Sequence, residues 1–352
     1  MDIKKDHINF AVGPVQISEE ISRIGADPVP YFRTPDFSAL MKENEALLKE
    51  FMDAPEDARA VFLTGSGTAS MDAVTQNVFT KDDRLLVVAG GSFGHRFCEI
   101  CEVYGIPHTA IELRQGHALP PADLAPYAGQ GYTGFLVNMH ETSTGVLYDM
   151  DMISAFCREN GLVLVVDAIS AFLADDVSMK RWGADVVVHS ATKYLNGHGD
   201  VIAGIVVGKA DFISQCRMFG LKDMTGAVLS PFDAFLMARG LKTLDIRMER
   251  HCANAQKVAA FFTSHPAVAK VYYPGLDTFP GHEIAAKQMK LPGGMISIEL
   301  KADRAAVAAA LNKLQLCTIA VSLGDAETLV EHPATMTHST YSAEELAAAG
   351  IS

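Results

Sequence analysis

Lys193 is the residue in this sequence best placed to do chemistry. It follows the apolar stretch DVVVHS (185–190), stands next to hydroxyl side chains and precedes the glycine-rich NGHGD (196–200). Burial lowers the pKa of a lysine, so an amine in this position becomes a usable nucleophile. The hydroxyls of Ser190 and Thr192 can donate hydrogen bonds to a phosphate. A solvated loop lysine is the alternative interpretation, but it requires neither the apolar stretch nor the hydroxyls.

Two other segments carry groups that complement this lysine. The turn TGSGT follows an apolar stretch and precedes a helical pattern, and a helix that begins in this way offers backbone N–H groups to an anion. Its Ser66, Gly67 and Thr68 are small or hydroxylated, which lets a phosphate approach closely. Asp167 stands at the carboxyl end of LVLVVD, where ligands of α/β proteins bind. A tight turn and an N-cap aspartate are the ordinary alternatives.

An anion-binding turn, then a carboxylate, then a lysine are together the groups that pyridoxal 5′-phosphate (PLP) requires. The lysine would hold the cofactor as a Schiff base, and Asp167 would keep its pyridine nitrogen protonated. Phe93, in GGSFGHR, could stack on the ring or belong to the core. Thr142 and Ser143, in HETSTG, could bond the phenolic oxygen or form an N-cap turn. We therefore predict a PLP enzyme with Lys193 and Asp167 as catalytic residues.

Apolar stretches that alternate with helical patterns must position these groups. As far as Gly208 the alternation predicts an α/β fold, with a mostly parallel sheet and helices on both of its faces. The predicted strands cover 60–64, 84–90, 134–139, 162–168, 185–190 and 201–208. Beyond this point the pattern becomes α+β. We predict a large PLP-binding domain over 1–240, with an N-terminal segment 1–35, and a smaller C-terminal domain over 241–352.

Composition limits the class of protein. The 352 residues are 49% hydrophobic and 20% charged, as expected of a soluble globular chain, and the net charge of −13 argues against nucleic-acid binding. No apolar run is long enough to span a bilayer, and the first ten residues lack a secretory core, so we expect a cytoplasmic enzyme without a membrane partner. Cys98 and Cys101 form a C-x-x-C without a second ligand pair, which predicts buried thiols and no metal.

The sequence resembles two families of PLP enzymes, one in each part of the chain. Residues 1 to about 185 resemble class V aminotransferases of the alanine–glyoxylate and 2-aminoethylphosphonate–pyruvate type, in NFAVGPVQIS, TGSGTASMDAV, GGSFGHR and VVDAISAF. From about residue 183 the chain resembles the methionine γ-lyase and cystathionine γ-synthase group, in GADVVVHSATKYLNGHGDVIAGIVVG and AVSLGDAETLVEHPATMTHS. Both families share the aspartate-aminotransferase-like fold, PLP fold type I, so the resemblance implies this fold in a hybrid chain.

The resemblance also implies further roles and two departures. Ser322 matches a position close to the substrate carboxylate, and Tyr31 and Arg33 loosely echo a pair that binds the phosphate of a neighbouring subunit. The γ-lyase group stacks a tyrosine where this chain has Phe93, and loss of that hydroxyl predicts slower elimination. Relatives continue past AGIS into a strand bearing the arginine that binds the substrate carboxylate. A truncated chain with weak substrate binding is therefore expected.

The function predicted from the γ-lyase resemblance is elimination or replacement at the γ-carbon of a sulfur amino acid such as methionine or cystathionine. This is carbon–sulfur lyase or transsulfuration chemistry. Two alternatives stay open: a class V aminotransferase that passes an amino group to pyruvate or glyoxylate, and a PLP-binding hybrid with little activity. The resemblance further implies a homodimer or homotetramer with its active site at the interface.

Overall fold

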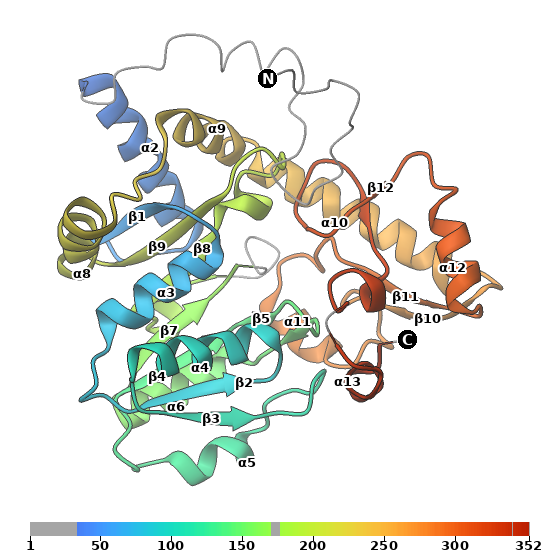
Figure 1. The fold of residues 1–352 in the computed structure, drawn as a ribbon, viewed down its shortest axis with the longest axis horizontal. Coiled ribbons are helices and arrows are strands. Elements are labelled where there is room, and N and C mark those ends of the chain that lie inside the picture. The colour runs from blue at the N-terminus through green and yellow to red at the C-terminus, as the bar shows by residue number, and fades with distance from the viewer. Residues whose placement is uncertain (1–33, 170–176, 340, 352) are drawn as a thin grey trace.

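A seven-stranded sheet organises the first part of the chain (Figure 1). The computed structural model describes residues 34–169, 177–339 and 341–351. The strands of the sheet are β1 (Ala58–Thr64), β2 (Leu85–Ala89), β3 (His108–Glu112), β4 (Gly134–Asn138), β7 (Val163–Asp167), β8 (Val186–Ser190) and β9 (Ala203–Lys209). Their order is β1-β9-β8-β7-β4-β2-β3, with β9 antiparallel to both neighbours and the other pairs parallel. The predicted mostly parallel sheet is confirmed.

Two apolar cores lie on opposite faces of this sheet, because successive side chains of a strand point to opposite faces. In β8, Val187 belongs to one core, whereas Val186 and Val188 belong to the other. The first core is covered by α2 (Pro35–Phe51), α6 (Met150–Asn160) and α9 (Pro231–Leu241). The second is covered by α3 (Gly67–Val78), α4 (Ser92–Tyr104) and α8 (Ala210–Gln215). The prediction of helices on both faces is therefore confirmed.

The later part of the chain contains one long helix, several short helices and short strands, as Figure 1 shows at its yellow-to-red end. Its elements are α10 (Leu244–Thr263), β10 (Val268–Tyr272), α11 (His282–Gln288), β11 (Ser297–Leu300), α12 (Arg304–Leu311), β12 (Thr318–Ile319), β13 (Leu329–Val330) and α13 (Ala343–Ala349). The predicted domain boundary near residue 240 falls where α9 gives way to α10, and it stays a prediction. No helix within the described residues is both long and apolar enough to cross a membrane.

A buried glutamine links the later part of the chain to the sheet region. Gln288, at the end of α11, accepts a hydrogen bond from the backbone N–H of Met150 at 2.7 Å and donates one to the carbonyl of Tyr148 at 2.9 Å. Both side-chain polar atoms are thus paired in a buried environment, which is the arrangement that burial of an amide requires. The contact fixes α11 against the start of α6.

The C-x-x-C thiols are buried on α4, so their predicted burial is confirmed. Burial raises the pKa of the Cys98 thiol to about 11 and that of the Cys101 thiol to about 12. Because the thiolate is the nucleophile and the metal ligand, both groups are held in their unreactive form.

Candidate active site

The predicted site residues gather at one end of the sheet. Asp167 ends β7 and Ser190 ends β8, and these strands are paired, with Asp167 opposite Val188. Gly67 begins α3 directly after β1, and a Cβ added to it would lie only 3.2 Å from the Cβ of Ser190. The predicted phosphate turn therefore lies against the strand that leads to the lysine.

Lys193 lies in an irregular turn that follows β8. The turn η2 (Ala191–Leu195) has π-helical hydrogen bonding, but Lys193 itself has the non-helical angles φ −95° and ψ −138°. Its Nζ donates a hydrogen bond to the Oγ of Ser322 at 2.9 Å. Burial lowers the pKa of the Lys193 ammonium below its usual value. More of this amine is therefore neutral near pH 7 than of an exposed lysine, as a nucleophilic or basic lysine requires.

Asp167 is completely buried at the end of β7. One carboxylate oxygen accepts from the backbone N–H of Ile169 at 2.9 Å, and the other accepts from Asn138 Nδ2 at 3.2 Å. Burial raises the pKa of the Asp167 carboxyl to about 8, and the nearby Glu141 carboxylate adds to the shift. Since the donors from Ile169 and Asn138 are both neutral, a cation beside this carboxyl would stabilise its charged form.

The start of α3 and the end of β8 carry groups that could bind an anion. Ser66 is the N-cap of this helix, yet its side chain makes no capping hydrogen bond. The first N–H groups of a helix lack the usual partner one turn earlier, and within the described residues those of Gly67 and Thr68 are the ones that could bind an anion, since the N–H of Ala69 donates to the carbonyl of Ser66 at 2.9 Å. Thr192 Oγ1 accepts from the backbone N–H of Ala203 at 3.2 Å, which leaves its own proton for another acceptor. These donors suit a phosphate.

Phe93 lies half-buried in the first turn of α4, and a buried carboxylate fixes its backbone. Glu141 accepts from the N–H of Gly94 at 2.9 Å and from that of Phe93 at 3.3 Å. The hydroxyl of Ser143 donates to Glu141 at 2.7 Å and accepts from the N–H of Ser92 at 2.9 Å. Thr142, half-buried, lies between the two capping residues. The 141–143 segment therefore positions the aromatic residue.

Glu141 was not among the residues singled out from the sequence. The motif HETSTG points to its hydroxyls, and a cap that joins residues 48 positions apart leaves no local pattern in the sequence. Replacing Glu141 with glutamine should lower the free energy of unfolding by about 1–3 kcal/mol, because the two helix N–H groups bond different carboxylate oxygens and the amide replaces one of these with an NH₂ that cannot accept. Urea unfolding measures this. The exposed Glu99→Gln on the same helix is the control, and an equal effect of both variants would contradict the capping role.

A second residue that the sequence did not indicate connects the C-terminal segment to this helix. The hydroxyls of Tyr341 and Ser92 lie 2.8 Å apart, so Tyr341 is placed beside the first turn of α4. Its ring also packs edge-on against His338. Ser322 and Tyr341 thus both bring the later part of the chain to the site. Tyr31 and Arg33 lie outside the described residues.

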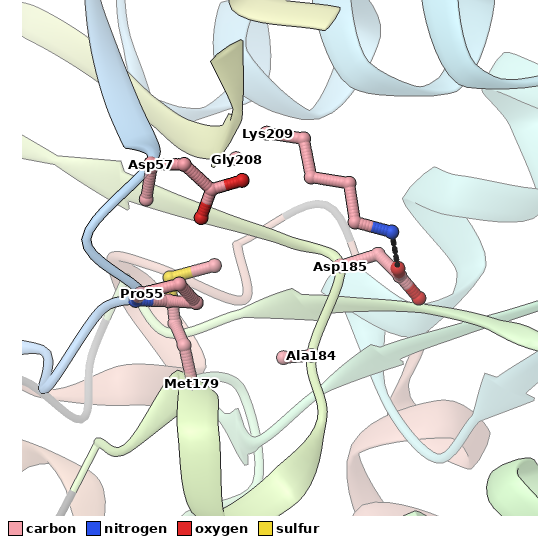
Figure 2. A pocket seen from close by; sticks show the side chains of 8 residues that line it. Pro55, Asp57, Met179, Ala184, Asp185, Gly208 and Lys209 are labelled. Atoms are coloured by element: carbon pink, nitrogen blue, oxygen red, sulfur yellow. Dashed lines mark hydrogen bonds and ion pairs between the residues drawn. The ribbon is translucent and has the colours of Figure 1, made fainter.

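A small cavity lies at the opposite end of the sheet, where β8 begins and β9 ends. Figure 2 shows the Lys209–Asp185 ion pair of 3.1 Å among its lining side chains. The lining residues are Pro55, Asp57, Ala58, Met179, Ala184, Asp185, Gly208 and Lys209. None of the predicted site residues is among them, so this cavity is separate from the candidate site.

The donor set at the carboxyl ends of the strands fits PLP. The start of α3 offers N–H groups and hydroxyls for a phosphate. The buried Asp167 fits a protonated pyridine nitrogen, because the positive charge of that nitrogen would stabilise the ionised Asp167 carboxylate. Lys193 supplies the amine, and Phe93 supplies an aromatic ring on a fixed helix end. The chemistry of the residues therefore agrees with the cofactor predicted from the motifs.

The fold and this set of groups define a PLP-dependent enzyme of fold type I. The model of the family described as Cys/Met metabolism PLP-dependent enzyme matches residues 33–352, and the chain belongs to this family. The cofactor is thus PLP, and the predicted enzyme of sulfur amino-acid metabolism is confirmed.

Relatives and solved structures agree with this membership. The chain is 41% identical over 329 residues to an L-methionine gamma-lyase of Fusobacterium nucleatum subsp. polymorphum, covering 90% of this chain and 79% of the relative. It is 63% identical over 170 residues to that of Porphyromonas gingivalis, covering 48% of this chain and 43% of the relative. A structure of cystathionine gamma synthase from Xanthomonas oryzae pv. oryzae superposes with a TM-score of 0.76 at 34% identity, covering 88% of this chain and 79% of that one.

The predicted division of the chain between two families is not supported. One family model spans the expected junction near residue 185, and the comparisons support neither a class V segment nor a hybrid nor a truncation. The physical reason for the resemblance is that both families bind the same cofactor on the same fold. Motifs such as TGSGT and VVDA reflect those shared demands and do not separate the families.

Proposed function

We propose that this enzyme catalyses γ-elimination from L-methionine or a related sulfur amino acid. With methionine and water the products are ammonia, 2-oxobutanoate and methanethiol. The observation that carries the proposal is the half-buried Lys193 amine, hydrogen-bonded to Ser322 and placed one strand away from the buried Asp167. The similarity to L-methionine gamma-lyases favours this substrate class.

Lys193, Ser322 and Asp167 would have different roles in the reaction. When bound, PLP supplies an electron sink for the substrate carbons. Lys193 Nζ would take the proton from the substrate Cα, helped by its lowered pKa, and Ser322 Oγ orients the amine. Asp167 would hold a negative charge against the pyridine nitrogen.

The remaining predicted residues would bind the cofactor. The phosphate would lie among donors from the start of α3 and the end of β8, contributed by Ser66, Gly67, Thr68, Ser190 and Thr192. Phe93 would stack on the ring, and Thr142 would bond its phenolic oxygen. The phosphate donors stand where β1 leads into α3 and where β8 ends, and Phe93 and Thr142 stand at the capped start of α4, which would hold the cofactor in a fixed position.

The ring of Phe93 leads to a prediction about rate. Replacing Phe93 with tyrosine adds a hydroxyl that can protonate the departing thiolate, so the elimination rate should rise about tenfold or more. Initial rates of thiol release from L-methionine, at saturating substrate, measure the effect. An unchanged or lower rate in a folded, PLP-loaded Phe93→Tyr enzyme would show that this position does not limit departure of the thiolate.

The proposal is tested by ammonia and thiol release from L-methionine without a 2-oxo acid acceptor. Joint release of both products in equal amounts is expected. Turnover that begins only when pyruvate or glyoxylate is added would favour the aminotransferase alternative. A spectral change on adding amino acid, without product, would favour a PLP-binding protein with little activity.

An assembly of two or four copies is also part of the proposal. The helical segment η3 (Cys216–Thr225) and the residues after it expose several large apolar side chains, which are Met218, Phe219, Met224 and Val228. Exposed apolar groups that cluster in this way are typical of a protein–protein contact. The occupant proposed here is a second copy of the chain, and sedimentation velocity of the PLP-loaded protein tests it.

A further inference from the structure

The turn that carries Lys193 ends in carbonyl groups that its own backbone does not satisfy. The carbonyl of Lys193 is paired with the N–H of Gly197 at 2.9 Å. The next two carbonyls are instead paired with a side chain from α10: Arg247 Nη1 donates to Tyr194 at 2.9 Å and Nη2 donates to Leu195 at 3.4 Å. Carbonyls at the end of a helical turn need such external donors, and the guanidinium supplies them.

Arg247 is itself fixed on several sides. Its Nη2 also donates to the carbonyl of Gly240 at the end of α9, at 2.8 Å, and its Nε donates to Thr243 Oγ1 at 3.1 Å. The guanidinium fills the space beside Gly197, where an added Cβ would lie 1.8 Å from Nη1. A planar group with this many donors in a fixed fork loses little freedom when it makes several hydrogen bonds.

The loop that carries Ser322 lies against the same turn. A Cβ added to Gly324 would lie 2.5 Å from the backbone nitrogen of Tyr194, so this loop and the turn are in direct contact. The Asp325 carboxylate of the loop interacts electrostatically with Arg247. Arg247 therefore stands where the lysine turn, the end of α9 and the Ser322 loop meet.

We propose that Arg247 is a positioning residue for Lys193. By holding the carbonyls of Tyr194 and Leu195, it fixes the irregular turn and so aims the lysine amine across to Ser322. The inference rests on the proposed role of Lys193 as the lysine that binds PLP. A lysine at position 247 would keep the positive charge but could not bridge the same carbonyls, so charge and geometry can be separated.

The experiment follows the visible absorption band that appears when PLP is added to cofactor-free protein and forms a Schiff base. Arg247→Ala should slow band formation by about tenfold or more, because small misplacements of a reacting group are costly. Arg247→Lys should slow it as well, and millimolar guanidinium chloride should restore much of the rate in Arg247→Ala. Arg250→Ala, an exposed arginine one turn further along α10, is the matched control and should react like the wild type.

The outcomes separate positioning from a purely structural role. Thermal unfolding is measured on every variant. A lower melting temperature with an unchanged rate of band formation would overturn the inference, and so would slow formation in Arg250→Ala. If Arg247→Ala does not fold, the rate of band formation in Arg247→Lys is the test: a slow rate supports positioning, and a wild-type rate overturns the inference. Absence of the band in the wild type would overturn the proposed function, and with it this inference.

Discussion

Replacement of Lys193 by alanine is expected to lower the rate of thiol release from L-methionine by about a thousandfold or more. The side chain would serve both as the amine that holds PLP and as the base at the substrate Cα. Its 2.9 Å hydrogen bond to Ser322 shows that the amine is directed inward. Initial-rate measurements on PLP-loaded protein give the result.

A matched control separates this loss from general damage. Lys257 is exposed on α10, and its replacement by alanine should leave the rate within about a factor of two. Circular dichroism and thermal unfolding of the Lys193→Ala protein should match the wild type. Near-normal thiol release by a folded Lys193→Ala enzyme would place the chemistry on another residue.

The second large effect is expected from Asp167. Replacing Asp167 with asparagine removes the negative charge beside the pyridine nitrogen but keeps an acceptor for the N–H of Ile169. We expect the elimination rate to fall about a hundredfold or more, since the ring then loses the charge that keeps its nitrogen protonated. The exposed Asp82→Asn serves as the control and should retain the wild-type rate.

Although Asp167→Asn should slow the reaction, it should make the cofactor-free protein more stable at neutral pH. The folded-state pKa of Asp167 is raised from 3.8 to about 8, so the folded state binds this proton more tightly than the unfolded chain. Its contribution to stability is fully present below pH 3.8 and is lost as the pH rises to about 8, at about 1.4 kcal/mol per pH unit. Urea unfolding across this window should show the loss in wild type and not in Asp167→Asn. Parallel pH dependence of the two proteins would contradict the assignment.

The sheet could be predicted from the sequence because its strands are short, apolar and nearly continuous, as buried parallel strands must be. Each of the six predicted strands is present, with ends that differ by at most two residues. Strand β3 was missed, since HTAIE lies at the edge of the sheet and only Ile111 in it is fully buried. A half-buried edge strand of mixed polarity does not differ locally from a loop.

The candidate site could be predicted where its groups follow directly from a strand or open a helix. Lys193 and Asp167 belong to this kind, and so does the turn around Gly67. Residues whose contact partners are far away in the sequence could not be predicted. Glu141 caps a helix 48 positions before it, and Arg247 reaches a turn 53 positions away, so neither contact has a signature in local spacing.

The most direct test of the central claim, that Lys193 holds PLP, is borohydride reduction of the PLP-loaded protein. Reduction makes the bond between lysine and cofactor permanent, and proteolysis with mass spectrometry then locates the phosphopyridoxyl group. We expect this group on the peptide that contains Lys193 and expect no label at this position in Lys193→Ala. Stoichiometric labelling of a different lysine in the wild type would contradict the account.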